Sequence, residues 1–336
     1  MKLKYYLLYF SVFVILSQIQ GNDYIFAQLT GTKTIKKSGG DYSSFATAIT
    51  DLNTYGVGAG GVVFNVDAGF TETAPSGGLV LGSATLNASL SATNTLTFQR
   101  VGLPKFHNPL ITAFTGGISY STDGIFKIQG ADYVTINQID LHENAANTTA
   151  PALMDWGYAI VKLSATDGCQ NINITNCTVT LAKLDAAGGY STGIYAGNHT
   201  ATSTTQLDIT TASGINSNIK INGCTLTGCY YPISIFGCTT LAYYDTGLEI
   251  GTTTGNTIKD FGGGSYGAYG ISVDDQNAPK IEHNSVTGGA NTTNTVNGIY
   301  VQSSCNGNIT INSNTDSVSG YTSGFIYAIA NEASQS

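Results

Sequence analysis

Apolar and polar residues alternate along short segments of this chain, and the same alternation returns several times. Residues 172–179, INITNCTV, place Ile172 and Ile174 on one face of a strand and polar residues on the other. The alternation then breaks at Asn176. Similar segments are VTINQIDL from 134, IKINGCTL from 219, a degenerate GLEIGTTTGNTI from 247, KIEHNSV from 280 and ITINSNT from 309. This recurrence indicates an internal repeat.

A second short strand, with the pattern apolar, any, apolar, precedes each of these segments. Its copies are FKI at 126, VKL at 161, IYA at 194, ISI at 233, ISV at 271, IYV at 299 and IYA at 326. The intervals between copies are uneven, from 27 to 39 residues. A constant core with loops of variable length is typical of stacked coils, whereas propeller blades have nearly fixed lengths. The pattern therefore predicts an all-β fold, a parallel β-solenoid.

One position at the bend of each repeat is filled by a small apolar residue or by Asn. Its occupants are Ile139, Cys177, Cys224, Asn284 and Asn314, with Asn256 in the degenerate copy. Coils of a solenoid lie about 4.8 Å apart, so side chains at one position stack into a column. We expect the Asn side chains to bond to the backbone and to each other. Cys177 and Cys224 are expected to fill space as buried free thiols rather than as a disulfide.

The N-terminal residues predict export. Lys2 and Lys4 precede an apolar run too short to span a membrane, which is typical of a secretory signal over residues 1–27, cleaved before Gln28. The expected location is outside the cell or on its outer surface. An exported chain meets an oxidising compartment, so disulfides among its six cysteines are permitted.

Residues 28–60 are expected to form a linker and a short capping helix. Phe45, Ile49 and Leu52 have helical spacing, with Asp41 available as the N-cap. Such a helix would cover the first coil and protect its edge. The solenoid is expected over residues 61–336 and ends on a core strand without a cover, so a further C-terminal region is expected to follow.

The amino-acid composition argues against several classes of protein. Only 10% of the 336 residues are charged, against about 25% in ordinary domains, so long amphipathic helices cannot dominate. A net charge of −8 and a single Arg, Arg100, argue against nucleic-acid binding. The remaining cysteines have no metal-ligand spacing, which argues against zinc.

The order of these segments resembles the right-handed, single-stranded parallel β-helix of the pectin lyase-like superfamily. The similarity covers about residue 38 to the end and includes GGVVFNV, TLTFQRVG and GIFKIQGADYVTINQIDL. KSGGDYSSFATAITDLNTYGV and GADYVTI are also similar to segments of large surface proteins exported by the bacterial type IX route. The resemblance implies a surface protein or a polysaccharide-degrading enzyme.

The polygalacturonase motifs of that superfamily are matched only in part. STDGI places Asp123 where their NTDGI has Asp, but the next coil, DWGYAI, offers only Asp155, two positions out of place. The following coil, STGIY, lacks their His. An inverting hydrolase needs two carboxyls roughly 6.5–9.5 Å apart. We therefore expect Asp123 to form a turn before Gly124.

The similar pectate lyases hold calcium with clustered carboxylates, and calcium takes six to eight oxygen ligands. The tightest acidic group here, Asp274 and Asp275 with Glu282, is a weak candidate for a calcium or catalytic site, and a solvated turn is the favoured alternative. The other three histidines lie near no recognisable nucleophile and are expected at the surface: His107, His142 and His199.

The middle residue of the second repeated strand is expected to point outward. This row reads Lys127, Lys162, Tyr195, Ser234, Ser272, Tyr300 and Tyr327. Aromatic rings and polar groups at coil spacing suit a polysaccharide or cell-surface glycan. The alternative is that loops between coils cover the row.

Two functions remain open. The preferred one is a non-catalytic, monomeric surface protein whose rigid face serves adhesion or polysaccharide binding, without a cofactor. The other is a polysaccharide lyase or glycoside hydrolase acting on acidic glycans, with calcium as a possible cofactor. An acidic protein with one Arg has little to neutralise uronates, which weighs against the second.

Overall fold

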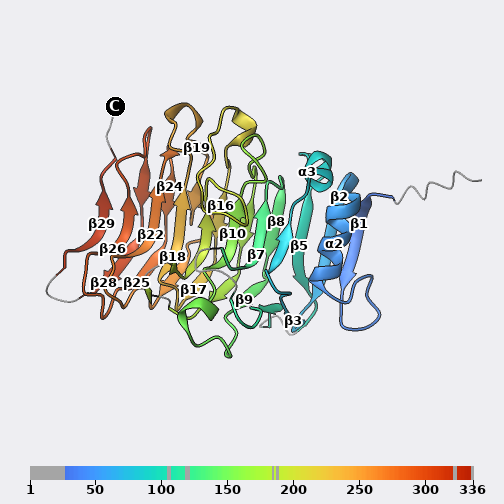
Figure 1. Ribbon diagram of the computed structural model, residues 1–336, viewed down its shortest axis with the longest axis horizontal. Helices are drawn as coiled ribbons and strands as arrows, with labels where there is room; N and C mark the ends of the chain where they lie inside the picture. The colour runs from blue at the N-terminus through green and yellow to red at the C-terminus, as the bar shows by residue number, and fades with distance from the viewer. Residues whose placement is uncertain are drawn as a thin grey trace, which may run out of the picture.

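The chain winds into stacked coils whose strands form three long parallel sheets (Figure 1). This confirms the predicted all-β parallel solenoid. The computed structural model describes residues 27–103, 107–117, 122–183, 185–186, 189–320 and 324–333. The predicted signal segment lies almost wholly outside them. No helix among these residues is long and apolar enough to cross a membrane.

Each sheet contains one strand from nearly every coil. Sheet A contains, in spatial order, β1 (Leu29–Ile35), β2 (Val57–Asp67), β5 (Leu96–Val101), β8 (Val134–Asn137), β11 (Asn173–Thr175), β16 (Lys220–Asn222), β20 (Glu249–Ile250), β24 (Lys280–Glu282) and β27 (Thr310–Asn312). Sheet B contains β3 (Thr71–Thr73), β6 (Leu110–Thr112), β9 (Asp140–His142), β12 (Thr178–Thr180), β17 (Thr225–Thr227), β21 (Thr257–Lys259), β25 (Ser285–Gly288) and β28 (Thr315–Val318). Sheet C contains β4 (Leu79–Leu81), β7 (Gly124–Gln129), β10 (Trp156–Val161), β15 (Thr192–Ala196), β18 (Tyr231–Phe236), β22 (Ala268–Asp274), β26 (Val296–Val301) and β29 (Ile326–Asn331).

The remaining strands and the 3-10 turns are short and lie in connections outside the three long sheets. Four are strands, the antiparallel β13 (Asp185–Ala186) with β14 (Gly189–Tyr190) and the parallel β19 (Asp245–Thr246) with β23 (Gln276–Asn277). Three are 3-10 turns, η1 (Ala150–Ala152), η2 (Ala212–Gly214) and η3 (Leu241–Tyr243).

The break in alternation at Asn176 is the corner between sheets A and B. Asn176 has φ +55°, a left-handed conformation that Asn and Gly adopt most easily. The same corner is left-handed at Gln138, Gly223, His283 and Ser313. One such residue turns the chain sharply, so the next one points inward and continues the core.

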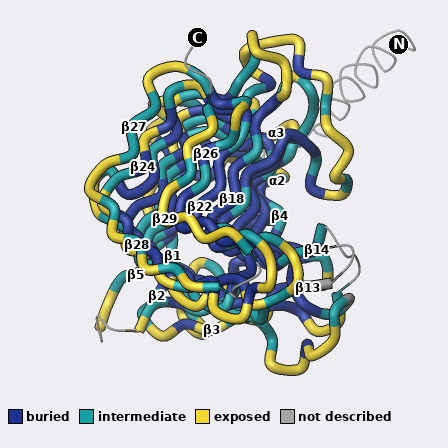
Figure 2. Tube along the Cα trace, turned by 90° about the vertical axis from the view of Figure 1, so that its left-hand side faces the viewer, coloured by how far each residue is buried: buried dark blue, intermediate teal, exposed yellow. Residues whose placement is uncertain are grey.

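Buried residues run through the middle of the stacked coils (Figure 2). Their apolar side chains form one large core cluster. Ile136, Ile174 and Ile221 are fully buried and lie in register on consecutive strands of sheet A. The column continues through Ile250 and Ile281. A column of identical side chains packs closely because each coil repeats the geometry of the last.

The inward position after the corner carries the hydrogen-bonded Asn column. Asn256 Nδ2 donates to Asn284 Oδ1 (2.8 Å), and Asn284 Nδ2 donates to Asn314 Oδ1 (2.9 Å). Asn256 Oδ1 accepts from the backbone N–H of Cys224 (2.9 Å), where the column changes to Cys. All six cysteines are buried and unbridged in the structure, including Cys177.

We expect Asn284→Ala to lower the free energy of unfolding by about 3 kcal/mol or more, because buried groups left without a partner cost roughly 1–3 kcal/mol each. The substitution deprives Asn256 N–H, Asn256 Nδ2 and the Ile250 carbonyl of their bonds. Urea unfolding measures the loss. Asn314→Ala, on the last and half-buried rung, is the matched control and should cost less. Equal losses would contradict a stabilising role for the interior column.

Helix α2 (Phe45–Tyr55) lies at the N-terminal end of the stack (Figure 1), where it contacts β4, the end strand of sheet C. It buries Phe45, Ile49 and Leu52, and α3 (Ala84–Ser89) packs beside it. The expected N-cap was wrong: Ser44 caps the helix and Asp41 bonds to Thr34. Strand β1 also lies in the segment expected to be a linker, where it pairs in parallel with β2.

Candidate functional site

The outer face of sheet C carries the row of side chains expected to point outward. Its register places Lys127 beside Ala159, then Tyr195, Ser234, Ser272 and Tyr300 on consecutive strands. Two expected members do not belong to it. Lys162 lies beyond the end of β10, and Tyr327 pairs with Asn297 while Ala330 pairs with Tyr300. Near Lys162 the motif apolar, any, apolar also fits three residues earlier, at 158–160, where the sequence is YAI. In the last strand the residues in register, IAN at 329–331, depart from the motif, so the motif selected Tyr327 instead.

A groove of about 560 Å³ lies over the middle of this row. The row changes from Tyr195 to Ser234 and Ser272 and back to Tyr300, so two small side chains form a floor between two large ones. Seven aromatic side chains line the groove: Trp156, Tyr190, Tyr195, Tyr231, Phe236, Tyr269 and Tyr300. The hollow therefore arises where small side chains replace large ones on a continuous sheet, and Thr204 of the adjoining loop also lines it.

The aromatic walls are stacked and rigid. Trp156 and Tyr195 are parallel, with ring centroids 4.9 Å apart and an interplanar angle of 4°. On the other wall Tyr269 stacks on Tyr231 (5.4 Å) and on Tyr300 (5.1 Å). Hydrogen bonds also hold the rings, since the hydroxyls of Tyr195, Tyr231 and Tyr300 donate to His199, Gly267 and Glu332. Their positions are thus fixed before any ligand arrives.

His199 was expected at the surface, and this expectation is wrong: only 1% of it is exposed. Its Nδ1 lies 2.8 Å from the Thr200 carbonyl and must donate, so Nε2 accepts from the Tyr195 hydroxyl at 2.7 Å. Its ring also packs on Trp156. Burial lowers the pKa of His199, which keeps the imidazole neutral. This histidine fixes the Tyr195 wall, and nothing in its sequence spacing indicated the contact.

A loop over residues 197–217 explains why two lysines of the expected row are buried. Ala201 packs on Trp156 and Val161 of the outer face, and its carbonyl accepts from Lys127 Nζ at 3.5 Å. Lys127 is 4% exposed and Lys162 is 0% exposed. Neither lysine can contact a glycan directly in this arrangement.

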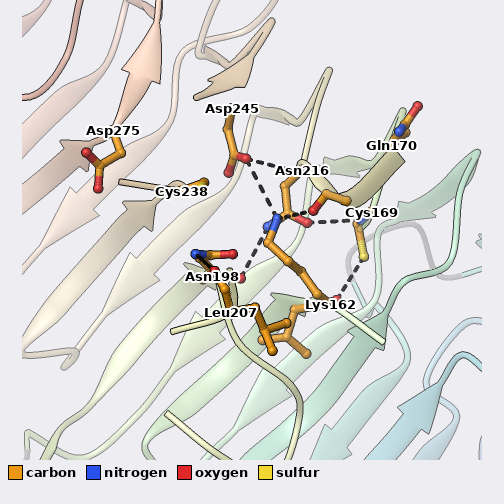
Figure 3. Close-up of polar contacts among 12 residues, drawn as sticks. Lys162, Cys169, Gln170, Asn198, Leu207, Asn216, Cys238, Asp245 and Asp275 are labelled. Carbon is orange, nitrogen blue, oxygen red and sulfur yellow. Dashed lines mark hydrogen bonds and ion pairs between the residues drawn. The ribbon is translucent and has the colours of Figure 1, made fainter. Parts of the chain in front are cut away.

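Lys162 is the centre of a buried polar cluster (Figure 3). Its Nζ donates to the Gly214 carbonyl at 2.7 Å and lies 3.8 Å from Asp245 Oδ1. Asp245 Oδ1 also accepts from the backbone N–H of Asn216, whose own side chain accepts from Cys169 N–H. Burial raises the pKa of Asp245 to about 6 and lowers that of Lys162. The cluster fastens the loop to the coils.

Asp123 and Asp155 meet at one end of the groove, on adjacent coils. Asp123 N–H donates to Asp155 Oδ2 (2.8 Å), and the Asp123 carbonyl accepts from Asp155 N–H and Trp156 N–H. Asp155 lines the groove and is 2% exposed. Burial raises the pKa of Asp155 to about 7; the bond from Asp123 N–H opposes this and the charge of Asp123 adds to it.

The weak calcium candidates are not brought together. Asp274 ends β22 in sheet C, whereas Glu282 lies in sheet A. Asp275 turns the chain between them with φ +52°, and burial followed by the charge of Asp274 raises its pKa to about 6. Over the described ranges, no three His, Cys, Asp or Glu side chains are grouped to hold a metal ion.

Among known proteins, no family model matches this chain and no curated protein is similar to it.

Proposed function

We propose that this protein binds polysaccharide without cleaving it, in the groove on sheet C. The observation that carries the proposal is the floor of Ser234 and Ser272 between stacked aromatic walls. Sugar rings have apolar faces that pack against aromatic groups and hydroxyls that need polar partners. A ligand site with largely apolar walls and a few polar groups has this composition.

The N-terminal segment and the resemblance to type IX surface proteins support a place on the outer cell surface, where glycan binding would serve adhesion. Membership of the pectin lyase-like superfamily is part of the same proposal. The expected export is tested by mass spectrometry of the mature protein, whose first residue should be Gln28. A retained N-terminus on a protein inside the cell would refute it.

A second candidate, a glycoside hydrolase, rests on Asp155. A carboxyl with a pKa near 7 at the end of a groove could act as a general acid. Oligosaccharide release by the wild type that Asp155→Asn abolishes would favour it over simple binding.

The binding proposal is testable through Trp156, the only tryptophan of the chain and a wall of the groove. Titration with oligosaccharides should change its fluorescence. Ser234→Phe should fill the hollow and weaken binding at least about tenfold, or 1.4 kcal/mol. Tyr195 shows that the outer face accommodates a ring in this row.

Thr227→Phe, on the outer face of sheet B, is the matched control and should leave the affinity unchanged. No fluorescence response across neutral and acidic oligosaccharides would refute the proposal. So would equal weakening by the two substitutions.

A further inference from the structure

The groove on sheet C has no cation to offer a ligand. Of its thirteen lining residues none is Lys, Arg or His, and Asp155 is the one carboxylic acid. The neighbouring Lys127 is 4% exposed, and its Nζ lies within bonding distance of the carbonyls of Thr122 and Ala201. His199 is buried behind the wall.

The charged groups at the two ends of the groove are acids. Asp155 closes one end, where its Oδ1 is buried and has no hydrogen-bond partner among the described residues. At the other end Glu332 Oε2 accepts from the Tyr300 hydroxyl at 2.8 Å. The whole chain carries a net charge of −8. An anion in the groove would therefore meet a carboxyl group at either end and no cation among the lining residues.

A bound uronate would lose part of the hydration of its carboxylate. Burying a charge without an opposite charge or several hydrogen bonds is costly. A neutral sugar of the same shape avoids this cost, because its hydroxyls can donate to and accept from Ser234, Ser272, Gln302 and the Tyr hydroxyls. The same aromatic walls serve both sugars, so charge is what distinguishes them.

We propose that the groove takes uncharged glycans and rejects their uronate counterparts. The inference rests on the proposed function and names the class of ligand for that site. This ligand class is the opposite of the acidic glycans that the resemblance to pectin-degrading enzymes implied.

The test compares matched pairs of oligosaccharides that differ only at C6, such as mannose with mannuronate and galactose with galacturonate oligomers. Trp156 fluorescence gives each Kd at low and at high ionic strength. The neutral member of at least one pair should bind about tenfold or more tightly, with a Kd independent of salt. Salt should improve uronate binding, because screening weakens repulsion.

Glu332→Gln removes one of the two acids while its amide oxygen can still accept from Tyr300. It should tighten uronate binding about threefold and leave neutral binding unchanged, whereas the exposed Asp208→Asn should alter neither. Uronates binding as tightly as neutral sugars, or binding that weakens with salt, would overturn the inference while the proposed function stood. Absence of binding by both members of every pair would remove the proposed function as well.

Discussion

Lys162→Met is expected to lower the free energy of unfolding by about 3–5 kcal/mol at pH 7.5, the usual cost of removing one partner of a buried ion pair. The variant leaves Asp245, 1% exposed, without its positive partner, and it leaves the Gly214 carbonyl without its donor. Because the pKa of Asp245 is already about 6, the carboxyl can take up a proton in acid. The loss should therefore be smaller at pH 5, and denaturant unfolding at both pH values measures it.

Lys183→Met is the matched control. Lys183 lies 2.6 Å from Asp260, closer than Lys162 lies to Asp245, but Asp260 is 64% exposed. Surface pairs contribute about 0–1 kcal/mol, so this variant should unfold almost as the wild type does. Similar losses from both variants would show that distance rather than burial determines the effect, and would contradict the role given to the buried cluster.

The wild-type protein is expected to become more stable as the pH falls from about 7.5 to about 5. Several carboxyls have a pKa raised by burial, to about 7 for Asp155 and about 6 for Asp132, Asp245 and Asp316. The folded state then binds protons that the unfolded state does not yet bind, so stability declines as pH rises through this window. One pKa unit corresponds to about 1.4 kcal/mol, so the interval between a pKa of about 7 and pH 5 makes Asp155 alone worth on the order of 3 kcal/mol in this window.

Urea unfolding across this pH range provides the measurement, and Asp155→Asn isolates the largest contribution. The amide oxygen of Asn can still accept from Asp123 N–H, so the variant should fold and lose much of the pH dependence. Asp208→Asn, at an exposed position, should retain it. A wild-type protein that loses stability on acidification to pH 5 would show that burial does not dominate these carboxyls.

The sequence was sufficient to predict the solenoid because the same short pattern of apolar positions returns in successive coils, although the coils differ in length. Ile136, Ile174 and Ile221 were aligned from sequence, and the structure pairs these residues. The corner at Asn176 was also visible, since a polar residue interrupts a regular alternation there. Both signals are local to one coil, so reading one repeat at a time finds them.

The sequence was not sufficient to predict which side chains come together on the outer face of sheet C. Strand β10 is longer than the three-residue motif, so two alignments fitted and Lys162 was placed in the wrong one. Its burial depends on Gly214, which lies 52 residues away along the chain. The groove likewise depends on Trp156, Ser234 and Tyr300 coming from different coils. Such sites exist only once the register between coils is known.

The corners between sheets A and B are nearly uniform in length, whereas the connections next to sheet C can be long. Five of the six corners from β8 to β28 have just two residues between strands, with Asn176 and Cys177 as one example. The 197–217 loop shows that another corner tolerates a large excursion and turns it into a wall. Grafted peptides or whole inserted domains would therefore be accommodated on the sheet C side, leaving the Asn spine and its hydrogen bonds undisturbed.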